Sequence, residues 1–335
     1  MKGLFTPSRC KNTWDIDFEP ATPVFHRRAS KIGVSLETRE NKHFCTIFLC
    51  RDMESLFDAA YRCLIANTID TKLELTERTM QAWRSNALSL ATQGGAKPIS
   101  TPGRPAQPVL IAPEAVPKRR LGTKAGWIAL IHAVTHIEFN AINLAWDAVY
   151  RFHNLPECYY SDWIRVATEE AFHFCLLRQR LQDLGSDYGD LPAHDGLWEM
   201  AVRTATDPLL RMALVPRVLE ARGLDVTPGI IRKLRQAGDH QTAAVLEIIW
   251  RDEIGHVAIG SRWFHYLCTQ RGLDAELTFR DLVQQYFTGQ ISGPLHHAAR
   301  QQAGFSTTEL KELERLSPKS HTPLSCKTPS CSIQE

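Results

Sequence analysis

The chain has 335 residues, of which 44% are hydrophobic and 23% charged, enough to bury one substantial core. Its formal net charge of +2 gives no strong positive field, so the composition supports neither a nucleic-acid partner nor a membrane-surface partner. Nine cysteines occur without a CxxC pair and the N-terminal residues show no charged-then-apolar signal segment, so we expect a reducing, cytoplasmic location.

The part of the chain before the first long helical pattern is expected to form three segments. In order, these are a poorly structured segment (1–50), a helical subdomain (51–92) and a linker rich in Gly, Pro and Ala (93–117). Apolar residues at three- and four-residue steps predict the two helices of the subdomain, near Met53–Asn67 and Thr71–Asn86.

Four long helical patterns within residues 118–302 predict an all-α protein built on a four-helix bundle. Their expected bounds are Lys124–Phe152, Tyr159–Leu184, Asp195–Arg222 and Asp239–Arg271. Pro208 and Pro216 should kink or break the third helix, because proline lacks the amide hydrogen that a helix interior uses.

Further helices are expected around and after this bundle. A short one should begin at Thr227 and end near Ala237, and a last one should cover Phe279–Gln301. Asp195 is expected to cap the third bundle helix and Gly223 to end it. Residues 317–335, rich in Ser, Thr and Pro, are expected to be a disordered tail.

The bundle region contains two copies of an acidic pair followed by a histidine. In each copy a glutamate precedes the histidine by three residues on the apolar face of a helix, and another glutamate lies on a second helix, 32 or 33 residues upstream. The side chains that share this pattern are Glu138, Glu170, His173, Glu220, Glu253 and His256. Carboxylates and imidazoles in this order are the ligands of dinuclear metal sites in helix bundles.

Burying these six groups would be costly unless something neutralises the carboxylates. Salt bridges are the alternative, but the apolar faces carry no Lys or Arg other than Arg217, near Glu220. A pair of divalent cations would neutralise the carboxylates directly. Oxygen-rich ligation with two imidazoles and no thiolate favours two iron ions, or alternatively manganese or a mixed iron–manganese pair, over structural zinc.

Three further side chains are candidates for contacting the ligands rather than the ions. Glu169 and Asp252 each precede a motif by one residue, so each could reach the neighbouring helix and accept a hydrogen bond from the histidine of the opposite copy. The alternative is that both are ordinary surface charges. His136 lies on a different face from Glu138, so we expect it to pack in the core or contact a ligand side chain.

Several segments of the bundle region share motifs with a known family. They are His132–Glu138, the Glu169-Glu170-x-x-His173 motif, Pro192–Met200, Met212–Pro228 and the block Arg251–Gly260. On these segments the chain resembles the ferritin-like DUF455 proteins, within the ferritin-like superfamily, from about Leu121 to Leu267. The resemblance implies a fold and a metal site but no particular reaction, since relatives in that superfamily include di-iron hydroxylases, oxidases and ferroxidases.

Three classes of function are compatible with these patterns. We expect most strongly a di-iron oxidoreductase, an oxygenase or oxidase that uses O₂ on an unknown small organic substrate, with an electron donor as a possible partner. The alternatives are iron handling by ferroxidase activity and a non-catalytic, metal-stabilised bundle that serves as an interaction module. The sequence predicts neither the substrate nor the oligomeric state.

Overall fold

The computed structural model describes residues 53–92, 94–117, 122–287 and 293–316. Within these residues the chain is an all-α helical bundle, as predicted, with one short pair of strands. The segments expected to be poorly structured or disordered, 1–50 and 317–335, lie outside the described residues. Every element below belongs to the unit Glu54–Glu335.

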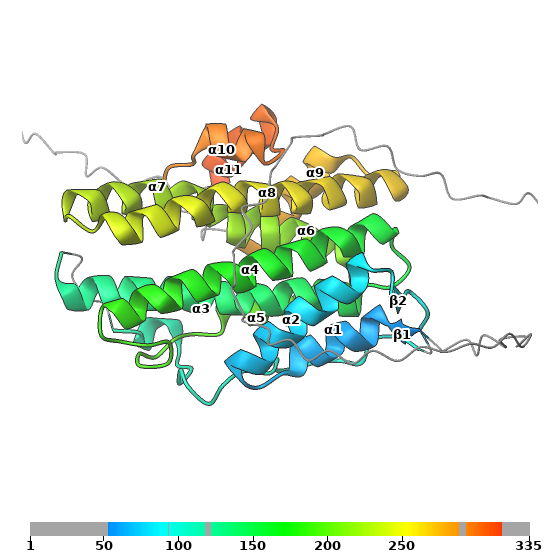
Figure 1. Ribbon diagram of the computed structural model, residues 1–335. Helices are drawn as coiled ribbons and strands as arrows, with labels where there is room; N and C mark the ends of the chain where they lie inside the picture. The colour runs from blue at the N-terminus through cyan, green and yellow to red at the C-terminus, as the bar shows by residue number, and fades with distance from the viewer. Residues whose placement is uncertain (1–52, 93, 118–121, 288–292, 317–335) are drawn as a thin grey trace, which may run out of the picture. The chain divides into compact units, whose positions relative to one another are not determined.

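The bundle is built from three long helices and one interrupted helical segment. The long helices are α3 (Lys124–Arg151), α4 (Glu157–Asp183) and α8 (His240–Gln270), and the segment comprises α6 (Pro208–Leu214), the π-helix η2 (Val215–Glu220) and α7 (Ala221–Gln236). Helix α3 packs along α4, and α8 contacts α4, α6, η2 and α7 (Figure 1).

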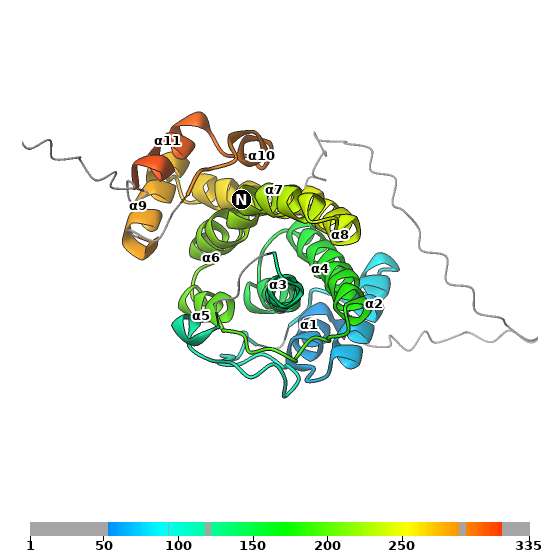
Figure 2. The same ribbon diagram turned by 90° about the vertical axis from the view of Figure 1, so that its left-hand side faces the viewer.

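Helix α3 lies at the centre of the bundle in the end-on view, with α1 (Leu56–Ile65), α4, α5 (Gly196–Arg203), α6, α7 and α8 around it (Figure 2). Most of its faces are apolar and buried, which is typical of a helix in the middle of a core. In the described part of the chain it is the one helix long and apolar enough to cross a membrane, with a mean hydropathy of 1.2. However, 67% of that apolar stretch is buried inside the protein, as in the core helix of a bundle.

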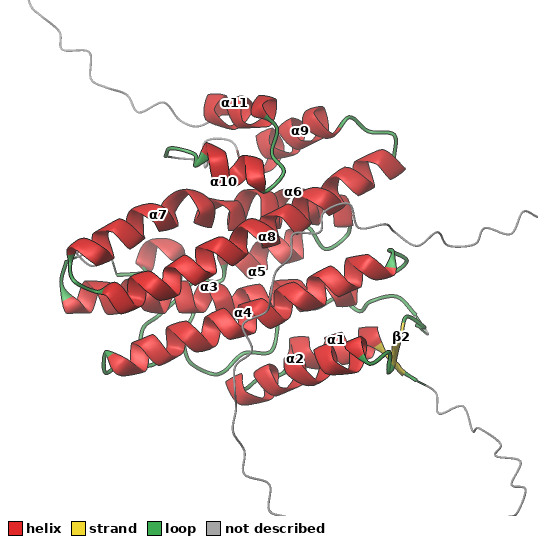
Figure 3. Cartoon of the chain, turned by 45° about the horizontal axis from the view of Figure 1, so that its top comes forward, coloured by secondary structure: helices red, strands yellow, loops and turns green. Residues whose placement is uncertain are grey.

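Smaller elements precede and follow the bundle in the chain, and one, α5, lies between α4 and α6. They are β1 (Glu54–Ser55), α1 (Leu56–Ile65), α2 (Ile69–Arg84), β2 (Leu88–Ser89), the 3₁₀ turn η1 (Pro113–Ala115), α5 (Gly196–Arg203), α9 (Ala275–Phe287), α10 (His297–Gln302) and α11 (Thr307–Leu316). Strands β1 and β2 are parallel. Helix α1 packs on α3 and α2 packs on α4, whereas α10 lies against α7 and α8 and α11 lies against α9 (Figure 3).

The third bundle segment is interrupted at both prolines, as predicted. Over Asp195–Arg222 the chain forms α5, α6 and η2, with a break before Pro208 and a π-helix at Pro216. The chain then stays helical through Gly223, so the expected end there and the separate helix from Thr227 are wrong. Pro228 is tolerated inside α7 because the carbonyl it leaves without an amide partner, that of Leu224, accepts a hydrogen bond from Trp250 at 3.1 Å.

Two further expectations about helix ends are corrected. The last helix does not run over Phe279–Gln301, since α9 ends at Phe287 and α10 begins at His297, and α11 was not predicted. Asp195 occupies the position before α5 but its side chain makes no capping hydrogen bond. Instead, the ring of His194 accepts the hydrogen bond of the Gly196 amide at 3.2 Å.

Candidate metal centre

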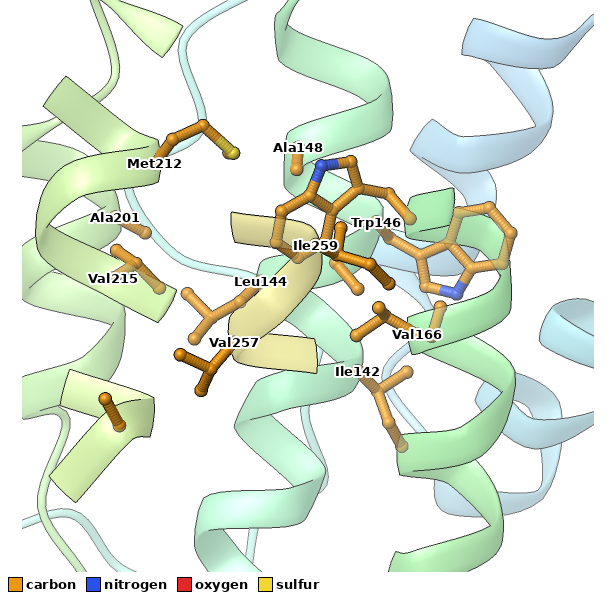
Figure 4. Packing of buried hydrophobic residues seen from close by; sticks show 14 of the residues in the cluster. Ile142, Leu144, Trp146, Ala148, Val166, Ala201, Met212, Val215, Val257 and Ile259 are labelled. Carbon is orange, nitrogen blue, oxygen red and sulfur yellow. The ribbon is translucent and has the colours of Figure 1, made fainter. Parts of the chain in front are cut away.

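The six predicted ligands lie on four segments of the bundle. Glu138 lies on α3, Glu170 and His173 on α4, Glu220 at the end of η2, and Glu253 and His256 on α8. One turn further along the same faces, apolar side chains such as Ile142, Val166 and Ile259 fill the core (Figure 4). We call these six side chains the acidic layer. The layer is part of the bundle interior, where water screens its charges only weakly.

Glu170 lies between the two histidines. Its Oε2 is 3.3 Å from Nδ1 of His173, and its Oε1 is 2.9 Å from Nδ1 of His256. Glu138 Oε2 is also 3.3 Å from His173 Nδ1, and Glu253 Oε1 is 3.7 Å from His256 Nδ1. One ligand atom from each of Glu138, Glu170, His173 and Glu253 lies within 4.8 Å of the other three. The arrangement thus has two halves, each with one imidazole nitrogen, joined by Glu170.

Several ligand atoms in this layer are buried without a hydrogen-bond partner among the described residues. They are Glu138 Oε2, Glu170 Oε1, Glu220 Oε2, Glu253 Oε2 and His256 Nδ1. Although Glu170 Oε1 and His256 Nδ1 are 2.9 Å apart, they lack the alignment of a hydrogen bond. Buried polar atoms are normally paired, so this group of unpaired oxygen and nitrogen atoms fits metal ions as the missing partners.

The outer nitrogens of the two histidines contact the acidic residues suggested by the sequence, and the contacts cross between the copies. His173 Nε2 is 3.2 Å from Asp252 Oδ2, and His256 Nε2 is 2.8 Å from Glu169 Oε2. A carboxylate in this position accepts a hydrogen bond from the protonated Nε2. The lone pair of Nδ1 is then free for a metal ion. The side chains of Asp252 and Glu169 are 21% and 39% exposed, so these contacts lie where the layer approaches solvent.

Burial and neighbouring charges raise the pKa values of three carboxyl groups in this layer and lower that of the fourth. Burial and the charge of Glu170 raise the pKa of Glu138 well above its usual range and also raise that of Glu253. Burial and the charges of Glu253 and Glu170 raise the pKa of Glu220 to about 8. Burial opposes ionisation of Glu170 too, but the charge of His256 and the hydrogen bond from His173 outweigh it and lower its pKa. Without metal ions, protons balance much of the negative charge.

The histidines show the complementary effect. Burial alone would lower the pKa of His173, but the nearby carboxylates of Asp252, Glu138 and Glu170 raise it well above its usual value. Burial likewise opposes protonation of His256, and the charge of Glu170 with the hydrogen bond to Glu169 raises its pKa well above its usual value. A cation entering the layer would therefore replace protons on several groups.

Glu220 reaches the layer through the π-helix. Helix η2 contains Pro216, and the wide π turn accommodates a proline that would disrupt an α-helix. Pro216 packs directly on Gly260 of α8, where an added Cβ would lie 2.3 Å from the proline Cγ. Gly260 thus allows η2 to approach α8, and this close contact helps to position Glu220.

His136 contacts a different set of groups. Its Nδ1 accepts a hydrogen bond from the hydroxyl of Tyr188 at 2.9 Å, and its Nε2 is 3.1 Å from the carbonyl of His194. The hydrogen-bond partners of both ring nitrogens are therefore residues other than the six candidate ligands. Burial lowers the pKa of His136 to about 4, so the ring is neutral at physiological pH.

Several cations are buried near the bundle core, and the sequence did not indicate the partners of two of them, Lys72 and Arg217. Lys72 of α2 donates to the carbonyl of Cys63 at 2.8 Å and to Asn143 Oδ1 of α3 at 2.7 Å, and burial lowers its pKa to about 7. Its signal was a lysine at helical spacing with the buried Thr76 and Met80. Arg217, expected near Glu220, instead donates to Glu309 of α11 at 2.6 Å, so it does not neutralise the metal ligands.

Comparison with known proteins identifies the family. The family model described as "Protein of unknown function (DUF455)" matches residues 65–311. The chain belongs to the DUF455 family. A relative from Haemophilus influenzae, described as "Uncharacterized protein", is 51% identical over 213 residues, which cover 62% of this chain and 74% of that protein. No solved structure gives a significant match. All six candidate ligands of this DUF455 protein fall within the matched residues.

Proposed function

We propose that this DUF455 protein is a ferritin-like, dinuclear carboxylate protein that holds two iron ions, or manganese or a mixed pair, and oxidises a small organic substrate with O₂. The observation that carries the proposal is Glu170, which presents one oxygen to each histidine Nδ1 in a buried layer of unpaired ligand atoms. Such a carboxylate is suited to bridge two ions.

The residues divide between the two ions as follows. His173 and Glu138 would hold one ion, and His256 and Glu220 the other. Glu170 and Glu253 would help to hold both ions, because Glu170 approaches both histidines and Glu253 lies near His256 and belongs to the compact group around His173. Two ions carry four positive charges and would match the four carboxylates when both histidines are neutral.

The protein itself would contribute ligand geometry and a water-poor surrounding. Asp252 and Glu169 would keep the proton of each histidine on Nε2, which would leave both Nδ1 lone pairs available to metal ions. The apolar side chains one turn away limit access of water to the layer. When bound, the two ions would supply redox and Lewis-acid chemistry toward O₂, and an electron donor would restore them to the reduced state.

The test is O₂ uptake by protein loaded anaerobically with ferrous iron. We expect uptake well above that of free ferrous iron in the same buffer, and little uptake by a Glu220→Ala variant. Arg165→Gln, a change on an exposed residue of α4, is the matched control and should behave as wild type. Uptake equal to that of free iron would contradict the oxidoreductase. Ferric iron accumulating far beyond two ions per chain would favour iron handling instead.

A further inference from the structure

A cavity of about 250 Å³ lies where η2 and α7 meet the C-terminal helices. Three arginines line it: Arg217 of η2, Arg222 of α7 and Arg300 of α10. The rest of its lining is apolar and includes Leu219 and Phe287. None of the six candidate metal ligands lines this cavity. The cavity is therefore separate from the acidic layer, and the charged side chains that line it are positive.

Two of these arginines are buried and have unused hydrogen-bond donors. Arg217 is fully buried, and its Nε and Nη1 have no acceptor among the described residues. Arg300 is 3% exposed, and its Nη1 likewise has none. Phenylalanine rings surround the Arg217 guanidinium at 4.1 to 4.7 Å but supply no conventional acceptor atom. Buried donors without an acceptor are costly, so an acceptor held in the cavity would be stabilising.

Each oxygen of the acidic partners of these arginines already accepts a hydrogen bond. Glu309 accepts from Arg217 through Oε1 and from the Ser306 amide through Oε2. Asp225 accepts from Arg300 through both oxygens, at 2.9 and 2.8 Å, and its Oδ2 is 3.7 Å from Arg222. Three guanidinium groups therefore share two carboxylates, which leaves one positive charge without a partner in this cluster.

We propose that the cavity binds a small organic monoanion, a carboxylate attached to a short apolar chain. The carboxylate supplies one negative charge and two acceptor oxygens, which match the charge excess and the unpaired donors of Arg217 and Arg300. The leucine, valine and phenylalanine side chains bury the chain. The volume is close to the lower limit for small-molecule sites, so the ligand is small.

The test is calorimetric titration of the metal-free, full-length protein with straight-chain carboxylates of increasing length, since this readout needs neither metal nor activity. Primary amines of the same lengths control for the apolar chain, and inorganic phosphate controls for negative charge. Arg222→Gln removes the partly exposed arginine and should weaken carboxylate binding about tenfold. Arg165→Gln makes the same charge change on an exposed residue of α4 outside the cavity and should have no effect.

Leu197→Trp supplies a second variant, because it fills the cavity without removing charge and should abolish binding. Binding that strengthens with chain length, is absent for amines and is lost in both cavity variants would support the proposal. Binding of amines as well as carboxylates, phosphate binding without carboxylate binding, no binding at millimolar concentration, or insensitivity to Arg222→Gln would each overturn it.

Discussion

His173 and His256 use their two ring nitrogens for different tasks. In both, Nδ1 faces the carboxylates of the layer and Nε2 faces an acidic side chain on the neighbouring helix. Because a carboxylate on Nε2 keeps the proton there, it fixes the tautomer with a free lone pair on Nδ1. Removing that carboxylate should weaken metal binding by the histidine, although the histidine itself stays in place.

Replacing Asp252 tests this role at the scale of one residue. Asp252→Ala should lower metal affinity about 10- to 100-fold, because His173 loses the acceptor that orients it. The measurement is a competition titration with a chelator of known affinity. Arg251→Ala is the matched control: Arg251 is exposed and pairs with Asp252 at 3.0 Å, so it should change affinity little. Equal effects of the two variants would contradict a specific role for Asp252.

At the scale of elements, the contact between η2 and α8 depends on a residue without a side chain. Pro216 occupies the space in which a Cβ on Gly260 would lie, whereas a Cβ on Gly255 of the same helix would meet nothing within 4 Å. The two glycines flank His256 on α8 but differ in their surroundings. They therefore separate the effect of packing on η2 from the effect of helix propensity.

Gly260→Ala should destabilise the protein by about 1–3 kcal/mol, because the added methyl group overlaps Pro216 and pushes η2 away. The shift should also weaken metal binding, since η2 carries Glu220. Gly255→Ala should instead stabilise by about 0.5–1 kcal/mol, because alanine favours a helix interior. Denaturant unfolding and metal titration measure both effects. A neutral Gly260→Ala would refute the close contact.

The C-terminal helices are attached to the bundle through a buried ion pair. Arg217 of η2 is fully buried and donates to Glu309 of α11, which is 3% exposed. Glu309→Gln should cost about 3–5 kcal/mol in unfolding free energy, since it leaves a buried guanidinium without its counter-charge. Glu314→Gln on the same helix, where Glu314 pairs with His297 near solvent, should change stability by less than about 0.5 kcal/mol. Similar losses in the two variants would show that burial of the pair is unimportant.

At the scale of the whole molecule, the acidic layer should make the metal-free protein less stable as pH rises. Glu220 has a pKa of about 8 in the folded chain and an ordinary value when unfolded, so the folded state binds more protons between about pH 4.5 and 8. Stability from this group is present below that window and is lost through it. Glu138, Glu253 and both histidines act in the same direction because their pKa values are also raised.

We therefore expect the melting temperature of the metal-free protein to fall by several degrees from pH 6 to pH 8.5. Glu220→Gln, which cannot ionise, should reduce the fall. Added metal should reverse the trend, because the ligands must lose protons to bind it and affinity then rises with pH. Scanning calorimetry with and without chelator measures both effects. A metal-free protein whose stability rises over this range would contradict the pKa pattern.

The sequence predicts much of this structure because its signals are periodic. Glutamate and histidine replaced apolar residues at regular helical spacing, so the four segments and their inward faces could be identified. Glu169 and Asp252 each precede one motif by one residue, and this position also suggested their contacts with the histidines on the neighbouring helix. The all-α fold and the bounds of α3, α4 and α8 within a few residues came from the same signal.

The features that escaped the sequence depend on tertiary contacts. Pro228 predicted a helix start, but a tryptophan from α8 satisfies the carbonyl that this proline leaves unpaired. The π turn at Pro216 depends on the space above Gly260, and the partner of Arg217 lies 92 residues away, on a helix that was not predicted. No local pattern encodes such long-range compensation.

The most direct test of the central claim is the metal content of full-length protein purified without chelator, measured by mass spectrometry. A dinuclear site predicts about two iron or manganese ions per chain, lost in a Glu170→Ala/Glu253→Ala variant. A Glu247→Ala/Glu276→Ala variant, which removes two carboxylates outside the layer, should retain both ions. Folded, stable wild-type protein that contains no metal and takes up none when iron or manganese is supplied would contradict the claim.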